Sequence, residues 1–175
     1  MIITGGKYKG RKIQAPDEKI TRPTLSKVRQ GVFNSLYSLI GNFEGKSFLD
    51  MFGGSGIMGL EALSRGFKEV VVFEKNPRVA QILKKNYSSL GLTANLKIGD
   101  SLKFLENLEK NFDVIYIDPP YYSGVYEDVF CRISKANVQN KIIIAEHSEP
   151  LNIKGFTLMK EKKYGDKIIS YYNDL

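Results

Sequence analysis

Cysteine and histidine are almost absent from this chain of 175 residues, in which each occurs once. One cysteine cannot form an intrachain disulfide framework and offers no cluster for a zinc site, so we expect Cys131 to be a small buried side chain in a reducing compartment. The single histidine, His147, lies just past the last of several expected strands, and we expect a surface or turn residue there rather than a catalyst. The sequence predicts no metal site.

Long hydrophobic stretches are also missing. No run approaches the roughly 18 consecutive apolar residues that a membrane-spanning helix needs. The N-terminus lacks a cationic stretch followed by an apolar run, which a secretory signal would show. These absences argue against secretion and against membrane spanning, so we expect a cytoplasmic protein. With 42% hydrophobic residues, the chain suits one compact domain with an appendage and is too short for two.

Positive charge is concentrated at the N-terminus. Of the 26 Lys and Arg residues, eight lie in residues 1–29 together with only two acidic residues, so this segment accounts for +6 of the net charge of +7. Interleaved glycine and tyrosine suit contact with a phosphate backbone, although a solvated basic tail would give the same count. Because Ile2, Ile3 and Ile13 are β-prone residues around Gly-Lys turns, we expect a short basic β-hairpin extension over residues 1–22.

Downstream, helix-like and strand-like segments alternate. A helix is predicted over residues 24–40, with Thr24 or Ser26 as N-cap and Gly41 after its end. Apolar runs predict strands at 48–49, 70–73, 96–98, 114–117 and 142–144, separated by helical stretches at 57–65, 77–90, 101–110 and 123–137. This alternation indicates a mostly parallel sheet covered on both faces, and residues 156–172 predict a closing antiparallel hairpin. We therefore expect an α/β, Rossmann-like domain over residues 23–175.

In such a sheet a ligand binds at the carboxyl ends of the strands, near the point where the strand order reverses. After the first strand, Gly54-Ser55-Gly56-Ile57-Met58-Gly59 matches the pattern G-x-G-x-x-G and opens a helix, so the backbone can approach a ligand closely. Asp50 at the strand end suits a cationic, phosphate-free ligand. Glu74, at the end of the second strand, can hold both hydroxyls of a ribose, although an NAD site would need the same glutamate.

The remaining strand ends distinguish these ligands. Asp100 and Ser101 follow the third strand and can reach an adenine ring or equally cap the next helix. The fourth strand ends in Asp118-Pro119-Pro120-Tyr121, in which the prolines leave carbonyls free to accept hydrogen bonds and the tyrosine can stack on a heterocycle. These groups suit a planar amine, although a proline-rich turn after a buried strand is the simpler interpretation. A hydride-transfer reaction does not need groups that bind a planar amine, whereas methyl transfer to nitrogen does.

Several blocks of the sequence together resemble one known family. They are Gly5-Gly6 with Gly10-Arg11, Arg22-Pro23-Thr24 with Val28-Arg29 and Phe33-Asn34, and Gly59-Leu60-Glu61-Ala62-Leu63-Ser64-Arg65-Gly66. With the strand-end residues, the chain resembles class I S-adenosylmethionine-dependent methyltransferases, and more narrowly the RsmD family of small-subunit ribosomal RNA guanine-N2 methyltransferases. The likeness covers nearly the whole chain. It departs slightly at Gly54, where the family often has alanine, and at Tyr121, where phenylalanine also occurs.

The resemblance implies transfer of a methyl group from S-adenosylmethionine to the N2 amine of a guanine in 16S (small-subunit) ribosomal RNA. The expected catalytic residues are Asp118, Pro119, Pro120 and Tyr121. The expected cofactor-binding residues are Thr24, Asp50, Phe52, Gly53, Gly54, Ser55, Gly56, Glu74, Asp100 and Ser101. The target guanine has to be unpaired or flipped out. Candidates for the RNA grip are Lys7, Lys9, Arg11, Lys12, Arg22, Lys27 and Arg29. We expect a monomer that acts on the small ribosomal subunit or an assembly intermediate.

Other functions share part of this pattern. A DNA adenine-N6 methyltransferase uses the same Asp-Pro-Pro-Tyr turn, but such enzymes usually have an added target-recognition region, for which this chain has no spare length. A dinucleotide-dependent oxidoreductase shares the glycine loop and Glu74, and a non-catalytic RNA-binding module shares the basic segment. Binding of S-adenosylmethionine without binding of NAD separates a methyltransferase from the oxidoreductase.

Overall fold

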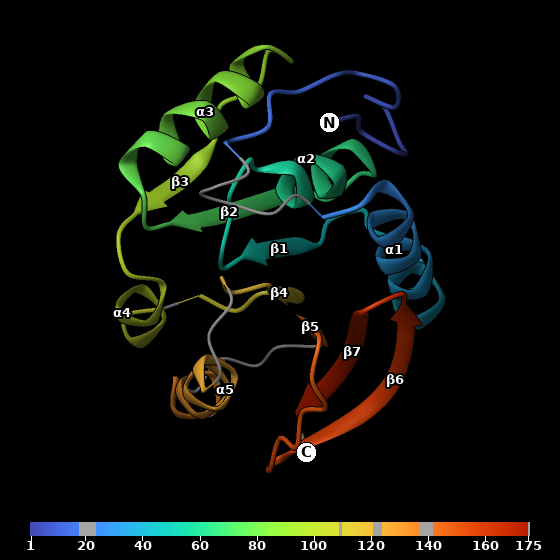
Figure 1. Cartoon of the computed structure of the whole chain (residues 1–175), viewed down its shortest axis with the longest axis vertical. Coiled ribbons are helices and arrows are strands. Elements are labelled where there is room, and N and C mark those ends of the chain that lie inside the picture. Colours follow the sequence, from blue (N-terminus) through green and yellow to red (C-terminus); the bar gives the residue numbers. More distant parts are fainter. Residues whose placement is uncertain (18–23, 109, 121–123, 137–141, 175) are drawn as a thin grey trace.

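The computed structural model describes residues 1–17, 24–108, 110–120, 124–136 and 142–174. Within them, one seven-stranded sheet has the order β3-β2-β1-β4-β5-β7-β6 (Figure 1). The strands are β1 Ser47–Asp50, β2 Glu69–Glu74, β3 Asn95–Ile98, β4 Val114–Ile117, β5 Ile142–His147, β6 Phe156–Tyr164 and β7 Lys167–Asp174. Strands β1 to β5 pair in parallel, whereas β7 pairs antiparallel with both β5 and β6. The predicted α/β sheet with a closing hairpin is confirmed.

Helices cover both faces of the sheet. They are α1 Ser26–Ile40, α2 Ile57–Ser64, α3 Pro77–Ser88, α4 Ser101–Glu106 and α5 Val125–Lys135. Residues on the first three helices share one core cluster, and residues on the last two share another. None of these helices is long and apolar enough to cross a membrane.

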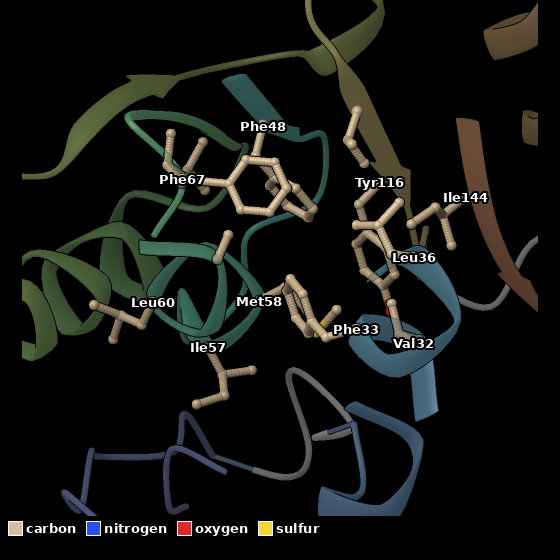
Figure 2. Packing of buried hydrophobic residues seen from close by; sticks show 14 of the residues in the cluster. Val32, Phe33, Leu36, Phe48, Ile57, Met58, Leu60, Phe67, Tyr116 and Ile144 are labelled. Carbon is tan, nitrogen blue, oxygen red and sulfur yellow. The ribbon is translucent and has the colours of Figure 1, made fainter. Parts of the chain in front are cut away.

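Strand β4 shows why its sequence is apolar throughout. Successive side chains of a strand point to opposite faces. Accordingly, Tyr116 lies in the cluster under α1 to α3, while Ile115 and Ile117 lie in the cluster under α4 and α5. Figure 2 shows the first cluster, where the rings of Phe33 on α1 and Phe48 on β1 stack with centroids 6.0 Å apart. A strand buried on both faces favours apolar side chains along its whole length.

The strand order reverses between β1 and β4. Strand β1 has β2 on one side and β4 on the other, and Asp50 at its end is in register with Tyr116 of β4. Chain connections leave this point in opposite directions, so the carboxyl ends of β1 and β4 border the crevice in which open α/β sheets bind ligands. Asp50 lies at the carboxyl end of β1, and Asp118 directly follows that of β4.

The N-terminal segment packs against the domain instead of projecting from it. Ile3 and Ile13 are buried in the cluster under α1 to α3. Ile2 and Lys12 form one antiparallel bridge, supported by the hydrogen bond from Ile3 N to Arg11 O (3.0 Å). Residues 5–10 between them form bends and turns. The pairing is therefore shorter than the regular hairpin that the sequence predicts.

Three local predictions need correction. Helix α1 begins after Leu25, which offers no side-chain cap, so neither Thr24 nor Ser26 is its N-cap. Cys131 is exposed because it lies on the outward side of α5, whose buried side consists of Val129, Phe130 and Ile133. His147 is buried, only 3% exposed, because β7 covers the end of β5 and Ser170 Oγ lies 2.8 Å from His147 Nε2.

Candidate active site at the carboxyl ends of the strands

Acidic residues from neighbouring strands gather at one edge of the sheet. Asp50 ends β1, Glu74 ends β2, and Asp118 follows the last residue of β4. Because these strands run parallel, their carboxyl ends lie at the same edge. The structure thus brings together three acids that lie far apart in the sequence.

Asp50 carries a buried acceptor that no described residue satisfies. Its side chain is 1% exposed, and Oδ1 accepts a hydrogen bond from Phe52 N at 3.2 Å. Oδ2 is buried, and no hydrogen bond reaches it from the part of the chain that the structure describes. Burial, and to a smaller degree the Glu74 carboxylate, raise the pKa of Asp50 to about 7, against the lowering effect of the Phe52 amide. An unsatisfied buried carboxylate fits a cationic ligand or a ligand that donates hydrogen bonds.

The glycine loop after β1 needs glycine for two separate reasons. Gly53 N donates to Phe73 O at 2.8 Å, and a Cβ at this position would lie 2.3 Å from Val72 Cγ1, so the loop lies directly against β2. Gly54 has a positive φ of +53°, with open space around the position of a Cβ. Ser55 is buried, and its Oγ accepts from Ile57 N at 3.3 Å at the start of α2. The loop therefore offers a ligand its backbone more than the Ser55 side chain.

Glu74 is fixed by two backbone donors. Oε2 accepts from Gly54 N at 2.8 Å, and Oε1 accepts from Asn76 N at 2.7 Å. Each carboxylate oxygen can accept more than one hydrogen bond, so the outward lone pairs can still receive two hydroxyl donors. The first of these bonds joins the end of β2 to the glycine loop after β1. The two backbone donors thus fix the orientation of the Glu74 carboxylate at the end of β2.

Asp100 and Ser101 have structural roles that the sequence left open. Asp100 is the N-cap of α4, and its Oδ1 accepts from Leu102 N at 2.9 Å. Ser101 is buried and its Oγ donates to Met51 O at 2.7 Å, which ties the start of α4 to the end of β1. These bonds place the start of α4 beside the same edge of the sheet.

Asp118 is half-buried at the end of β4. Thr24 Oγ1 is the donor for a long hydrogen bond of 3.5 Å to Asp118 Oδ2. Burial raises the pKa of Asp118 well above its ordinary value, the carboxylates of Glu146 and Asp50 raise it further, and Lys167 and Thr24 act in the opposite direction. The carboxyl group is therefore a stronger proton acceptor than an exposed aspartate.

The residues after Asp118 complete the turn only in part within the described structure. Pro119 is buried and Pro120 is exposed. The predicted stacking residue, Tyr121, lies outside the described residues, as does Arg22 of the predicted RNA grip. Phe52, another predicted cofactor contact, is half-buried after β1 and packs against the cluster under α4 and α5.

Five of the basic residues predicted to contact RNA are exposed. They are Lys7, Lys9, Arg11, Lys12 and Lys27. Arg29 is different, because it is only 1% exposed and its Nε lies 3.2 Å from Glu61 Oε1, a carboxylate that is itself fully buried. Its guanidinium also donates to the carbonyl oxygens of Ile2 and Thr24. The prediction that Arg29 contacts RNA is wrong, since its donors are used inside the protein.

One buried acid beside the site was missed from the sequence. Glu146 on β5 is 2% exposed, and its Oε2 accepts from Tyr116 OH at 2.6 Å. Its Oε1 lies 3.0 Å from Lys167 Nζ of β7. The available signal was an acid at the end of an otherwise apolar strand, but the sequence does not show that β5 lies between β4 and β7.

The strand order, the acids at the ends of β1 and β2, and the Asp-Pro-Pro turn after β4 define a class I methyltransferase. A solved structure supports this class. The structure named "Putative methyltransferase yhhF from Escherichia coli" superposes with a TM-score of 0.85 and 27% sequence identity, over 99% of this chain and 97% of that chain.

Sequence comparison identifies the family within this class. The family model described as "Conserved hypothetical protein 95" matches residues 1–173. "Ribosomal RNA small subunit methyltransferase D" of Haemophilus influenzae is 35% identical over 179 residues, which cover 97% of this chain and 90% of the relative. "Putative rRNA methyltransferase YlbH" of Bacillus subtilis is 30% identical over 183 residues, 98% of each chain. The chain belongs to this family, the RsmD family, as its sequence motifs predict.

Proposed function

We propose that this protein transfers a methyl group from S-adenosylmethionine to the exocyclic N2 amine of a guanine in small-subunit ribosomal RNA. The observation that carries the proposal is the position of Asp118 and its two prolines, next to Asp50 and the glycine loop across the strand-order reversal. An acceptor for an amine thus borders a site suited to a cationic nucleoside. The names of the relatives from Haemophilus influenzae and Bacillus subtilis, both described as rRNA methyltransferases, support RNA as the substrate.

The residues around the glycine loop fit the methyl donor. S-adenosylmethionine, when bound, supplies an electrophilic methyl group on a positively charged sulfur. Glu74 would accept hydrogen bonds from the two ribose hydroxyls, for which its backbone donors already orient it. Asp50 would accept from the cationic methionine portion, which satisfies the buried Oδ2 atom. Thr24, Phe52 and the start of α4 at Asp100 and Ser101 would border the rest of the cofactor.

Asp118 and Pro119 act on the nucleophile. The lone pair of guanine N2 is delocalised into the ring, so the amine is a poor nucleophile until that lone pair is localised. Hydrogen bonds from the amine to the Asp118 carboxylate and the Pro119 carbonyl draw the nitrogen toward tetrahedral geometry and hold it in line with the methyl group. When the N–C bond forms, the bond from the methyl group to sulfur breaks, so sulfur would leave as a neutral thioether and the positive charge would pass to nitrogen. Asp118 would then accept the released proton or pass it to water. The raised proton affinity of Asp118 suits this role.

The exposed basic residues of the N-terminal segment and of α1 would hold the RNA backbone. Lys7, Lys9, Arg11 and Lys12 lie on the segment that packs on α2, and Lys27 lies in the first turn of α1. Tyr121 would stack on the flipped-out guanine, a contact worth about 1 to 3 kcal/mol for a base on an aromatic ring. The exposed basic residues would bind the RNA backbone while one base enters the site.

The test separates binding of the donor from transfer of the methyl group. Asp118→Asn removes the charge and keeps the size of the side chain. Transfer of labelled methyl to RNA should fall by about 10²-fold or more, while the affinity for S-adenosylmethionine, measured by calorimetry, changes only modestly. Glu74→Gln should show the opposite pattern, in which the main loss is in the affinity for S-adenosylmethionine. Asp128→Asn on the exposed side of α5 is the matched control and should change neither quantity. Near-normal turnover in Asp118→Asn would contradict the proposed mechanism.

A further inference from the structure

A buried ionic cluster lies directly behind Asp118. It consists of Tyr116 on β4, Glu146 on β5 and Lys167 on β7, and we refer to it as the Glu146 cluster. Ile117 of β4 pairs with Ala145 of β5, so the next residues of these strands, Asp118 and Glu146, are neighbours across the sheet. Glu146 in turn pairs with Ile169 of β7, two residues from Lys167. Three strands therefore bring the cluster to the edge of the sheet at which β4 and β5 end.

The cluster lies on the same face of the sheet as Asp118. Tyr116 lies in the cluster on the side that α1 covers. Thr24, just before α1, has its Oγ1 atom 3.5 Å from Asp118 Oδ2, so the Asp118 carboxylate faces the same side. The hydrogen bond of 2.6 Å from Tyr116 OH to Glu146 Oε2 places the glutamate on that side too. Lys167 Nζ, 3.0 Å from Glu146 Oε1, closes the cluster from β7. Tyr126 OH of α5 donates to the backbone oxygen of Glu146 and fixes the strand end.

Stability alone does not account for such a cluster. Transfer of a carboxylate into the interior costs several kcal/mol, and replacing a buried ion pair by apolar side chains is often neutral or stabilising. Glu146 is 2% exposed and Tyr116 is 1% exposed, so both are deep in the protein, and Lys167 is only 19% exposed. Because Glu146 is fully hydrogen-bonded and lies beside Asp118, its position favours a role in the reaction.

We propose that Glu146 is a positioning residue whose negative charge, balanced by Lys167 and fixed by Tyr116, sets the strength with which Asp118 holds a proton. This inference rests on the proposed function, in which Asp118 accepts a proton from the amine. A negative charge behind Asp118 favours its protonated form, whereas Lys167 favours the carboxylate, and the two influences have these signs in the structure. Glu146 and Lys167 therefore act in opposite directions on the affinity of Asp118 for a proton.

The other described groups that act on Asp118 come from different elements. Asp50 on β1 adds negative charge, and Thr24 before α1 donates a hydrogen bond. Tyr126 on α5 stays neutral, because burial first and the charges of Asp118 and Glu146 next raise its pKa far above the physiological range. Burial, the largest cause of the raised pKa of Tyr126, does not depend on Glu146 or Lys167, so Tyr126 stays neutral when either is substituted.

Two substitutions with opposite signs test the inference. Glu146→Gln keeps the size of the side chain and an acceptor for Tyr116 but removes the charge, so the acid limb of the rate profile against pH should move down by about one pH unit. Lys167→Met removes the balancing charge and should move that limb upward. Asp128→Asn removes an exposed negative charge on α5 outside the cluster and is the control, with the limb in its original place. The double variant Glu146→Gln with Lys167→Met should fall between the two single ones.

A second measurement does not depend on methyl transfer. Carbon-13 carboxyl NMR of aspartate-labelled protein follows the titration of Asp118 directly, with Asp118→Asn to assign the signal, and it should show the same opposite shifts. Fixed titration and a fixed rate limb in both charge variants, with only a lower rate, would overturn the inference and leave Glu146 a structural residue. Opposite shifts by NMR in a protein that transfers no methyl group to RNA would keep the cluster and overturn the proposed function.

Discussion

Substitution of Arg29 by methionine tests whether this residue is an internal support or an RNA contact. Methionine has a similar length but no charge and no donors. In the native protein the guanidinium lies 3.2 Å from Glu61 Oε1 and donates to Ile2 O at 2.6 Å and to Ser26 Oγ at 3.1 Å. Glu61 is fully buried, so the substitution leaves a carboxylate without one of its two cationic partners.

The size of the effect follows from the burial of the pair. Removing one partner of a buried ion pair costs roughly 3 to 5 kcal/mol. Arg65 still pairs with Glu61, and Thr4 N still donates to it at 2.8 Å, so we expect the lower end of that range. For a domain of this length, about 3 kcal/mol corresponds to a fall of about 6 to 12 °C in the melting temperature Tm.

The assay is thermal unfolding without RNA, and the chain offers a matched control. Arg132 pairs with Glu106 at the surface, where the two side chains are 32% and 53% exposed. A surface pair contributes about 0 to 1 kcal/mol, so Arg132→Met should lower Tm by no more than about 2 to 4 °C. Equal shifts in the two variants would refute the reasoning. An unchanged Tm in Arg29→Met together with weaker RNA binding would restore the role predicted from the sequence.

The remaining predictions concern the donor site and the RNA grip. Burial raises the pKa of Asp50 to about 7, so the protein without S-adenosylmethionine loses stability as the pH rises from about 4 through 7. In chemical denaturation, the free energy of unfolding of Asp50→Asn should therefore rise relative to that of the parent between pH 5 and pH 8. A difference that stays constant with pH would contradict this. Gly53→Ala places a Cβ 2.3 Å from Val72 Cγ1 and should lower both Tm and donor affinity, so an unaltered protein would count against the loop geometry. Lys9→Glu with Arg11→Glu should weaken RNA binding and flatten its salt dependence, whereas Lys135→Glu on α5 should do so much less.

The strand-end residues could be predicted from the sequence because the rules that locate them are local. An apolar run that ends in Asp50, Glu74 or Asp118 marks both the strand and the side chain at its end. Parallel pairing then brings these ends to one edge, whatever the order of the strands. The need for glycine in this loop is equally local. Gly53 lies too close to β2 for a side chain, and Gly54 has a positive φ.

The Glu146 cluster and Arg29 could not be predicted in this way. Glu146 matters because β5 lies between β4 and β7, and that order is a property of the whole sheet. A charge count from the sequence includes Arg29 as a positive residue. In the fold it is buried beside Glu61, 32 residues later, and that carboxylate neutralises its charge. His147 and Cys131 show the same limit, because the burial of a side chain near the end of an element depends on which neighbour covers it.

The most direct test of the proposed activity is transfer of labelled methyl from S-adenosylmethionine to three substrates in parallel. They are small ribosomal subunits that lack the modification, naked small-subunit RNA, and duplex DNA. The account predicts label in N2-methylguanosine from the subunits or the RNA and none in the DNA. Label only in DNA adenine would contradict the proposed substrate while leaving the fold and the donor site in place, and no label in any substrate would contradict the proposed activity itself.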